Sequence, residues 1–455
     1  MTSTHRTVSA NVMTDLYLQS LQRLDLLEPL RRVPFRIQCR GNGFAPAERC
    51  LALLASQAQR CQRLTDWTFA LRHDSRLCHW MAGRPAPHYS TLSRSLAATD
   101  DETIRVLRRD VLVPLSDQAF FGVEATKRWL FVDVDTKGLR AEGATYEGTS
   151  YGRMSDGRNR RGYRLHLLSL DNRWPLEIEL TGANEHGVGQ GMVMCKRLMR
   201  RVSERLRRKL IIRGDSNYGC VRFVRYLQRY PCGYLLKGYN ASTALKLWRE
   251  NAAPRRRVCR VGKPDLLALE CGVTTLTGMT REKRADGTER RQAVRVTVPR
   301  VVVYREDPAQ VPDDKEPGCF FLITTLSERL YDSEQLLEAY LQRAGDIENI
   351  FSQVDQAFSI THLRSRKFYG NYTFLLLTMI AANLTQMVRD EAIRRELPIP
   401  AGLSETLTAA KESGLELRQD EEAGCVLHEG LLGTYATTFK AVLRCSYQHR
   451  FRYVA

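Results

Sequence analysis

The stretch WLFVDVD, residues 129–135, is the part of the sequence that decides the fold. It is a short run of apolar, β-branched and aromatic side chains, which is typical of a buried strand, and it ends in two carboxylates, Asp133 and Asp135. Because side chains alternate along a strand, both aspartates lie on one face. A second run, KLIIRGDSNYG (209–219), contains Asp215 just after its apolar part. Read singly, each aspartate is also consistent with a turn or helix cap, but acids at the ends of buried strands are costly unless paired or metal-bound.

Further apolar runs of the same kind continue outward from these two. They are YRLHLLSL (163–170), PLEIEL (175–180), GYLLKG (233–238) and CFFLITTL (319–326). Helical patterns alternate with the later strands, over 190–207, 219–230 and 333–358. This order predicts a mixed α/β core.

The regions on either side of this core, and one within it, have different patterns. From Asn11 to about Asp117 apolar side chains recur at helical spacing. Residues 239–317 contain VCRVGK, DLLALECGV, QAVRVTV and RVVVYRE, which alternate as antiparallel strands do. We therefore expect five parts: a helical N-terminal domain (1–120), the first part of the core (121–238), a β insertion (239–317), the rest of the core (318–398) and a tail (399–455). In the helical domain, Ser90 or Thr91 is expected to cap a helix near Leu92, which would place Arg94 for contact with a phosphate or for plain helix packing.

The charge of the chain indicates a polyanionic partner. The sequence has 69 Lys plus Arg against 51 Asp plus Glu, a formal charge of +18, which favours nucleic acid over an ordinary basic protein. The twelve cysteines are scattered without a Cys-x-x-Cys pair, as is typical of reduced thiols in a cytosolic protein. The longest apolar run, Phe374 to Leu384, is too short to cross a bilayer and is expected to be a buried helix. We expect a cytoplasmic protein that associates with the nucleoid when bound to DNA and has no membrane partner.

A third acid is predicted on the segment LLEAYLQRAGDIENIFSQVDQAF (336–358), which reads as one helix. Tyr340, Ala344 and Glu348 fall on one line at four-residue spacing, beside the buried stripe. Taken alone, Glu348 is more typical of a solvated helix glutamate. Together with the two strand aspartates, however, it would supply the hard oxygen ligands that Mg²⁺ or Mn²⁺ prefers.

Three segments in this order, FVDVDT, RGDSNYG and YLQRAGDIEN, resemble the signature blocks of DDE transposases from bacterial insertion sequences. The resemblance extends in order over about 11–384 and includes EGATYEGTSYG, TGANEHG and the β insertion before the third acid. Such transposases belong to the RNase H-like, retroviral-integrase superfamily. The resemblance therefore implies an RNase H-like mixed-sheet core, interrupted by a β insertion and preceded by an all-α DNA-binding domain.

Residue roles follow from the resemblance one position at a time. The first acid would be Asp135, directly before Thr136, with Asp133 as the competing assignment. Asp215 and Glu348 would be the second and third acids. With them the site would bind two Mg²⁺ or Mn²⁺ ions, which activate the attacking oxygen and stabilise the leaving oxygen of a phosphodiester.

Other positions of the signature concern DNA. Tyr340 and Arg343 resemble residues that contact terminal DNA phosphates. Relatives carry lysines on the helix after the glutamate, whereas this chain has Ser352 and Asp355. Either the nearby basic residues replace these lysines or end binding is weakened; the candidates are Arg364, Arg366 and Lys367. In the insertion, Arg255, Arg256 and Arg257 near Trp248 are expected to bind DNA, with the aromatic ring against a base and the cations on phosphates.

The resemblance implies a transposase that binds the terminal inverted repeats of its insertion sequence and catalyses strand cleavage and strand transfer. Its partners would be the transposon ends, target DNA and a second copy of the chain in a synaptic homodimer. Two alternatives remain open: a transposase-derived DNA-binding protein without cleavage activity, and a metal-dependent nuclease without strand transfer.

Overall fold

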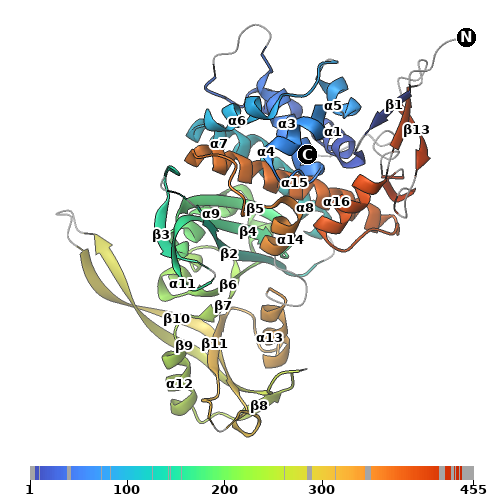
Figure 1. The fold of residues 1–455 in the computed structure, drawn as a ribbon. Coiled ribbons are helices and arrows are strands. Elements are labelled where there is room, and N and C mark those ends of the chain that lie inside the picture. Colours follow the sequence, from blue (N-terminus) through green and yellow to red (C-terminus); the bar gives the residue numbers. More distant parts are fainter. Residues whose placement is uncertain are drawn as a thin grey trace, which may run out of the picture.

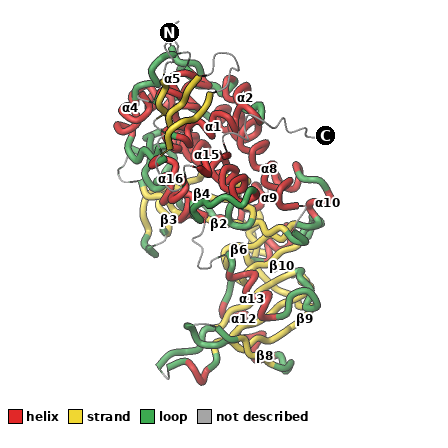
Figure 2. Tube along the Cα trace, turned by 90° about the vertical axis from the view of Figure 1, so that its right-hand side faces the viewer, coloured by secondary structure: helices red, strands yellow, loops and turns green. Residues whose placement is uncertain are grey.

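The structure is a computed structural model of the 455-residue chain. It describes residues 6–9, 11–37, 43–72, 74–81, 83–124, 127–141, 143, 145–154, 156–260, 262–283, 289–312, 314–343, 350–413, 415–419, 426–431, 435, 437–439 and 441–442. Figures 1 and 2 show helices gathered at one end of the molecule, the insertion at the other end, and the central sheet between them.

The helical end surrounds one long buried helix, α15 (Phe368–Arg394). The helices of the N-terminal region pack around it: α1 (Val12–Arg23), α2 (Leu27–Arg31), α3 (Pro46–Ala58), α4 (Leu64–Arg72), α5 (Ser75–Trp80), α6 (Tyr89–Ala97), α7 (Asp101–Leu107), the π-helix η1 (Arg108–Leu112) and α8 (Val113–Glu124). The apolar run 374–384 lies within α15 and is fully buried, as the sequence predicts. None of the helices in the described part of the chain combines the length and apolarity that crossing a membrane requires.

The central sheet contains all six apolar runs that the sequence identifies as strands. The strands of the core are β2 (Leu130–Arg140), β3 (Ser150–Arg153), β4 (Asn159–Leu170), β5 (Trp174–Gly182), β6 (Leu210–Gly219) and β7 (Gly233–Gly238). β4 pairs antiparallel with β2, β3 and β5, whereas β6 and β7 run parallel to β2. Three antiparallel strands followed by two parallel ones make the core RNase H-like, so the expected mixed α/β fold is confirmed.

Helices cover both faces of this sheet. On one face, α9 (Gly187–Arg201) and α11 (Val221–Leu227) pack on the even-numbered side chains of β2. On the other face, α14 (Ile350–Phe358) and α15 cover β4 and β5, and α13 (Ser333–Leu341) covers β6 and β7. The odd-numbered side chains of β2, including both aspartates, point to this second face. The first face also carries the short α10 (Glu204–Arg207).

The insertion extends the same sheet and does not form a separate one. The order continues from β7 through β11 (Cys319–Thr324), β10 (Glu289–Glu306) and β9 (Leu266–Lys283) to β8 (Arg255–Val258). The sequence prediction for the insertion was wrong in three details. The insertion begins with a helix, α12 (Ala241–Glu250), and its first strand, β8, precedes VCRVGK and shares only Val258 with it. QAVRVTV and RVVVYRE form a single strand, β10, that continues across Pro299. A short 3₁₀ turn, η2 (Pro308–Gln310), precedes β11. Figure 1 shows the paired ends of β9 and β10 projecting from the sheet as an arm.

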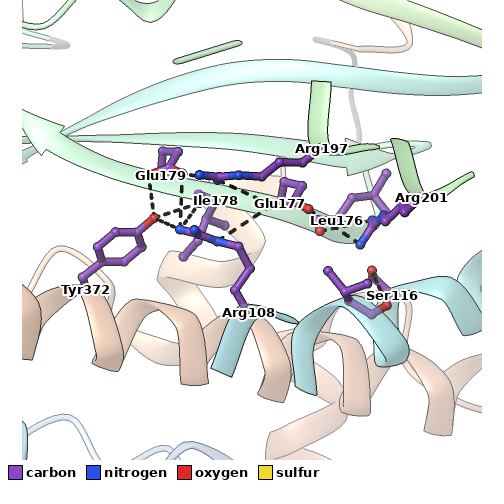
Figure 3. Close-up of polar contacts among 10 residues, drawn as sticks. Arg108, Ser116, Leu176, Glu177, Ile178, Glu179, Arg197, Arg201 and Tyr372 are labelled. Atoms are coloured by element: carbon purple, nitrogen blue, oxygen red, sulfur yellow. Dashed lines mark hydrogen bonds and ion pairs between the residues drawn. The ribbon is translucent and has the colours of Figure 1, made fainter. Parts of the chain in front are cut away.

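A polar network fastens the helical layer to β5 (Figure 3). Glu179 accepts hydrogen bonds from Arg197 of α9 and from the hydroxyl of Tyr372 of α15, the latter at 2.7 Å, and lies 3.3 Å from Arg108 of η1. Its neighbour Glu177 is buried and lies within 4.0 Å of Arg108, Arg197 and Arg201. These acids are balanced by arginines, so the network joins layers of the fold and does not present free carboxylates.

Two further expectations about elements were wrong. The single helix over 333–358 is two helices, because α13 ends at Leu341 with Gln342 as its C-cap. The helix near Leu92 begins earlier, at Tyr89, and its N-cap is His88. The tail contains a helix, α16 (Leu403–Glu412), and two strands, β12 (Leu415–Gln419) and β13 (Val426–Leu431). These two strands form a small sheet with β1 (Arg6–Ser9) near the start of the chain.

Candidate functional site: two aspartates on adjacent parallel strands

Asp135 and Asp215 lie side by side on neighbouring strands. The parallel ladder between β2 and β6 ends at the pair Val134 and Gly214, and the two aspartates are the next residue on each strand. Neighbouring strands are about 4.8 Å apart, and side chains at equivalent positions of parallel strands point to the same face. Asp135 keeps 20% of its side chain exposed. The structure therefore brings two of the sequence-predicted acids together in a partly open position.

Asp133 has a different environment from Asp135. It is buried, and both of its oxygens accept hydrogen bonds from Arg213 of β6, each at 2.8 Å. Arg213 also donates to the carbonyl oxygen of Ala339 in α13 and stacks on the ring of Phe131. This closed bidentate pair uses the hydrogen-bonding capacity of Asp133 within the protein. Of the two candidates for the first acid, the geometry favours Asp135.

Arg343 and Tyr340 face the two aspartates from the end of α13. Nη2 of Arg343 lies 3.1 Å from Oδ1 of Asp135 and 3.4 Å from the carbonyl oxygen of Val134. Tyr340 is buried beside it, and Arg343 lowers the pKa of the tyrosine through its charge and a hydrogen bond, although burial raises that pKa overall. In this structure both signature residues are buried, and Arg343 contacts Asp135 directly.

The electrostatics of the pair reflect two like charges in one place. Burial raises the pKa of Asp215, and the neighbouring Asp135 raises it further, while Arg343 and Asn217 lower it. Asn217 also holds the carboxylate through its backbone N–H at 3.0 Å and its side-chain amide at 3.1 Å, which is the turn geometry that the sequence allows for Asp215. Two neighbouring carboxylates disfavour each other's charged form, and a divalent cation held by them would stabilise both charged forms.

The donor chemistry fits Mg²⁺ or Mn²⁺, which prefer carboxylate oxygens. Among the described residues no group of three or more His, Cys, Asp or Glu side chains is placed to hold a metal ion. Glu348, the predicted third acid, lies outside the described residues, as do Ala344 to Asn349 as a whole. The residues on either side of that segment share one anchor: Asn172 donates to the carbonyl oxygen of Arg343 at 3.4 Å and accepts from the N–H of Ile350 at 3.2 Å.

A buried polar chain lies behind Asp135 on the opposite face of β2. The hydroxyl of Thr136 lies 2.8 Å from that of Tyr218 and 3.4 Å from Nδ1 of His166, whose Nε2 lies 2.9 Å from the hydroxyl of Thr181. Burial lowers the pKa of His166 to about 4, so its ring is neutral at neutral pH. The chain fixes the strand at the residue that follows Asp135.

The helix after the predicted glutamate carries an ion pair with β2. Lys137 of β2 binds Asp355 of α14 at 2.9 Å, so the acid that stands where relatives carry a lysine faces a lysine from the neighbouring strand. Of the proposed substitutes, Arg366 and Lys367 are exposed, and Lys367 lies 3.5 Å from Glu147. Arg364 is a poor substitute, because it is buried against Phe374, where burial lowers its pKa to about 10.

The expected DNA contacts of the insertion are corrected in one respect. Trp248 is only 4% exposed and lies beneath the guanidinium groups of Arg255 and Arg305, so its ring cannot stack on a base in this conformation. Arg255, Arg256 and Arg257 are exposed. Arg256 lies 3.2 Å from Asp332, and Arg257 pairs with Asp265 at 2.8 Å.

In the helical region, Arg94 is exposed on α6 and donates to the carbonyl oxygen of Ser90 on its own helix. It therefore lies in the C-terminal half of α6, because the helix begins at Tyr89 and not near Leu92.

Sequence reasoning missed Arg213, Lys137 and Asn172. Arg213 had a usable signal: a charged residue within the apolar run KLIIRGD must find a buried partner, and Asp133 is the residue beside it in register. Nothing in the sequence alone indicates that Lys137 meets Asp355 or that Asn172 joins two distant segments.

With this geometry in view, the chain can be placed among known proteins. A family model described as the transposase DDE domain matches residues 130–384, more than half of the chain. The protein belongs to the DDE transposase family. The matched residues begin at β2 and end within α15, so they include both strand aspartates and the β insertion.

No curated protein sequence matches the chain significantly. Among solved structures, the chain is similar to a piggyBac transposase, whose cryo-EM structure is a synaptic complex with hairpin DNA. The identity is 10% and the TM-score 0.44, over 98% of this chain and 85% of that one.

Proposed function

We propose that this transposase binds the terminal inverted repeats of a bacterial insertion sequence and catalyses metal-dependent DNA strand cleavage followed by strand transfer. The observation that carries the proposal is the pairing of Asp135 with Asp215 on adjacent parallel strands, where two carboxylates face one arginine. Glu348 would complete the set from the segment that precedes Ile350. The helical region 1–120, the insertion and a second copy of the chain would position the DNA ends.

In this mechanism Asp135, Asp215 and Glu348 would hold two Mg²⁺ or Mn²⁺ ions. The ions would supply Lewis-acid activation of the attacking oxygen and charge stabilisation of the leaving oxygen. The chain itself orients the carboxylates: the N–H of Thr136 donates to Oδ1 of Asp135 at 2.8 Å, and Asn217 holds Asp215. Burial and the closed pair of Asp133 with Arg213 keep this part of the strand fixed, so little reorganisation is needed during reaction.

The DNA partner is supported by charge. The formal charge of +18 favours a polyanion, and binding of this kind weakens with salt by about 0.9 in log K per phosphate neutralised. The exposed arginines of β8 are the candidates in the insertion, and Arg94 is the candidate in the helical domain.

A second candidate function is a transposase-derived DNA-binding protein without cleavage activity. It is favoured by one observation, that α14 carries Asp355 where relatives carry a lysine. The retention of both strand aspartates as an open pair supports cleavage instead.

One assay separates these functions. Labelled DNA containing the inverted repeats that flank the reading frame is incubated with wild type and Glu348→Gln in Mg²⁺ or Mn²⁺, and bound, nicked and joined products are followed. We expect wild type to bind, nick and join, and the variant to bind without nicking. Binding without nicking by wild type identifies the DNA-binding protein, nicking without joined products identifies a nuclease, and a variant that nicks at the wild-type rate would exclude Glu348.

A further inference from the structure

The guanidinium of Arg343 is buried in contact with the acid pair. Only 8% of the side chain is exposed, and Nη2 lies 3.1 Å from Oδ1 of Asp135. Within the described part of the chain, Nε of Arg343 has no hydrogen-bond partner, although it is buried. Burial by itself lowers the pKa of Arg343, but Asp135, Tyr340 and Asp215 raise it above its ordinary value. The arginine is thus kept in an otherwise unfavourable position by the charge of the aspartates.

Among the residues that the structure describes, Arg343 is a cation held against the acid pair. Asp133 and Arg213 neutralise each other in a closed pair, whereas Arg343 lies 3.1 Å from Asp135 and lowers the pKa of Asp215 through its charge. One monovalent guanidinium cannot neutralise two carboxylates, whereas one divalent ion can.

Arg343 and a divalent ion also compete for the same atoms. Oδ1 of Asp135 already accepts from the N–H of Thr136 at 2.8 Å and lies 3.1 Å from Arg343. An ion held by the two aspartates would need lone pairs of the same carboxylate. It would also place two positive charges next to the guanidinium in a partly buried position, where repulsion is poorly screened.

We propose that Arg343 is the counter-cation of the acid pair in the metal-free protein, and that a divalent ion binding Asp135 and Asp215 displaces its guanidinium from Asp135. The inference rests on the proposed function, because it takes these two aspartates as the metal ligands. The displaced guanidinium would be free to bind an anion. In the proposed function, this anion is a phosphate of the transposon end. Arg343 would then be a positioning residue that couples metal loading to the grip on DNA.

Mn²⁺ binding to the full chain without DNA tests the proposal. Affinity is measured by calorimetry for wild type, Arg343→Gln and Arg343→Lys, with folding checked by circular dichroism. We expect Arg343→Gln to bind Mn²⁺ on the order of ten- to a hundredfold more tightly, because the variant lacks the buried cation that is paired with Asp135. Arg343→Lys keeps the charge and should stay near wild type.

Lys137→Gln is the matched control. It removes a cation from the same face of the same strand, but one that Asp355 holds, so Mn²⁺ affinity should change by less than about threefold. If Arg343→Gln binds Mn²⁺ no more tightly than wild type while Asp215→Asn abolishes binding, the proposed metal site stands and the displacement is wrong. If neither wild type nor Arg343→Gln binds Mn²⁺, the metal site itself fails, and this inference with it.

A second measurement needs no variant at position 343. In a crystal structure of wild type with Mn²⁺ bound, the contact between Nη2 of Arg343 and Oδ1 of Asp135, 3.1 Å without metal, should be broken. A metal-bound site that retains this contact would overturn the proposal.

Discussion

The substitution Asp133→Asn should destabilise the fold strongly, whereas the same change at Asp215 should not. Asp133 accepts two hydrogen bonds from Arg213, each at 2.8 Å, and both side chains are 3% exposed. Asparagine keeps one acceptor oxygen but removes the charge, so a buried guanidinium is left without its counter-ion. Removing one partner of a buried ion pair costs about 3–5 kcal/mol. That is a large part of the roughly 5–15 kcal/mol that stabilises most domains.

Asp215→Asn provides the comparison because it removes a like charge from beside Asp135, where burial and that charge already raise the pKa of Asp215. Its free energy of unfolding should stay within about 1 kcal/mol of wild type or rise. Urea unfolding followed by circular dichroism measures both variants. The assignment of Asp133 to structure and Asp215 to chemistry would be refuted if Asp133→Asn lost less than about 1 kcal/mol, or if both variants lost equal amounts.

Three further predictions concern the surroundings of the site and the insertion. Burial lowers the pKa of His166 from 6.5 to about 4, so as pH falls the unfolded chain takes up a proton before the folded chain does. The free energy of unfolding should therefore drop by roughly 3 kcal/mol between pH 6.5 and 4. His166→Gln should flatten this pH dependence, which urea unfolding at a series of pH values measures. Trp248→Ala should lower the free energy of unfolding by about 3–5 kcal/mol, whereas Arg255→Gln should lower DNA affinity with little loss of stability; a Trp248→Ala variant of normal stability would contradict the buried position. A double-mutant cycle with Lys137→Gln and Asp355→Asn should give a coupling of about 1 kcal/mol in the free energy of unfolding. A coupling near zero would show that the pair does not hold α14 to β2.

The core strands could be predicted because burial on both faces gives each strand a nearly continuous apolar run. The apolar runs that contain Val132 and Ile212 differ sharply in composition from the surrounding loops. In the structure these two runs are neighbouring parallel strands. The elements of the insertion were harder to predict from the sequence. Its first part, ASTALKLWRE, forms helix α12 with Trp248 turned into the core, and local sequence does not reveal which partner covers an aromatic ring. The segment 333–358 was predicted as one helix because its apolar spacing continues throughout, whereas α13 ends at Leu341 and α14 begins at Ile350.

The neighbouring positions of Asp135 and Asp215 could be predicted from the sequence, but the partners of these acids could not. Alternation along β2 places Asp133 and Asp135 on one face, but it cannot separate them, since their difference lies in Arg213 on another strand. The third acid, Glu348, lies outside the described residues and stays a prediction. Long-range contacts such as that of Arg343 with Asp135 depend on the register of whole elements, which a single sequence does not specify.

The central claim is that Asp135 and Asp215 together hold the metal that drives DNA cleavage. The most direct test is single-turnover nicking of terminal-repeat DNA in Mg²⁺ or Mn²⁺ by wild type, Asp135→Asn and Asp215→Asn, with Lys137→Gln as a folded control and DNA binding measured in parallel. We predict that both aspartate variants still bind DNA but nick it at least about a hundredfold more slowly, while the control nicks normally. Nicking by either aspartate variant at the wild-type rate would contradict the claim.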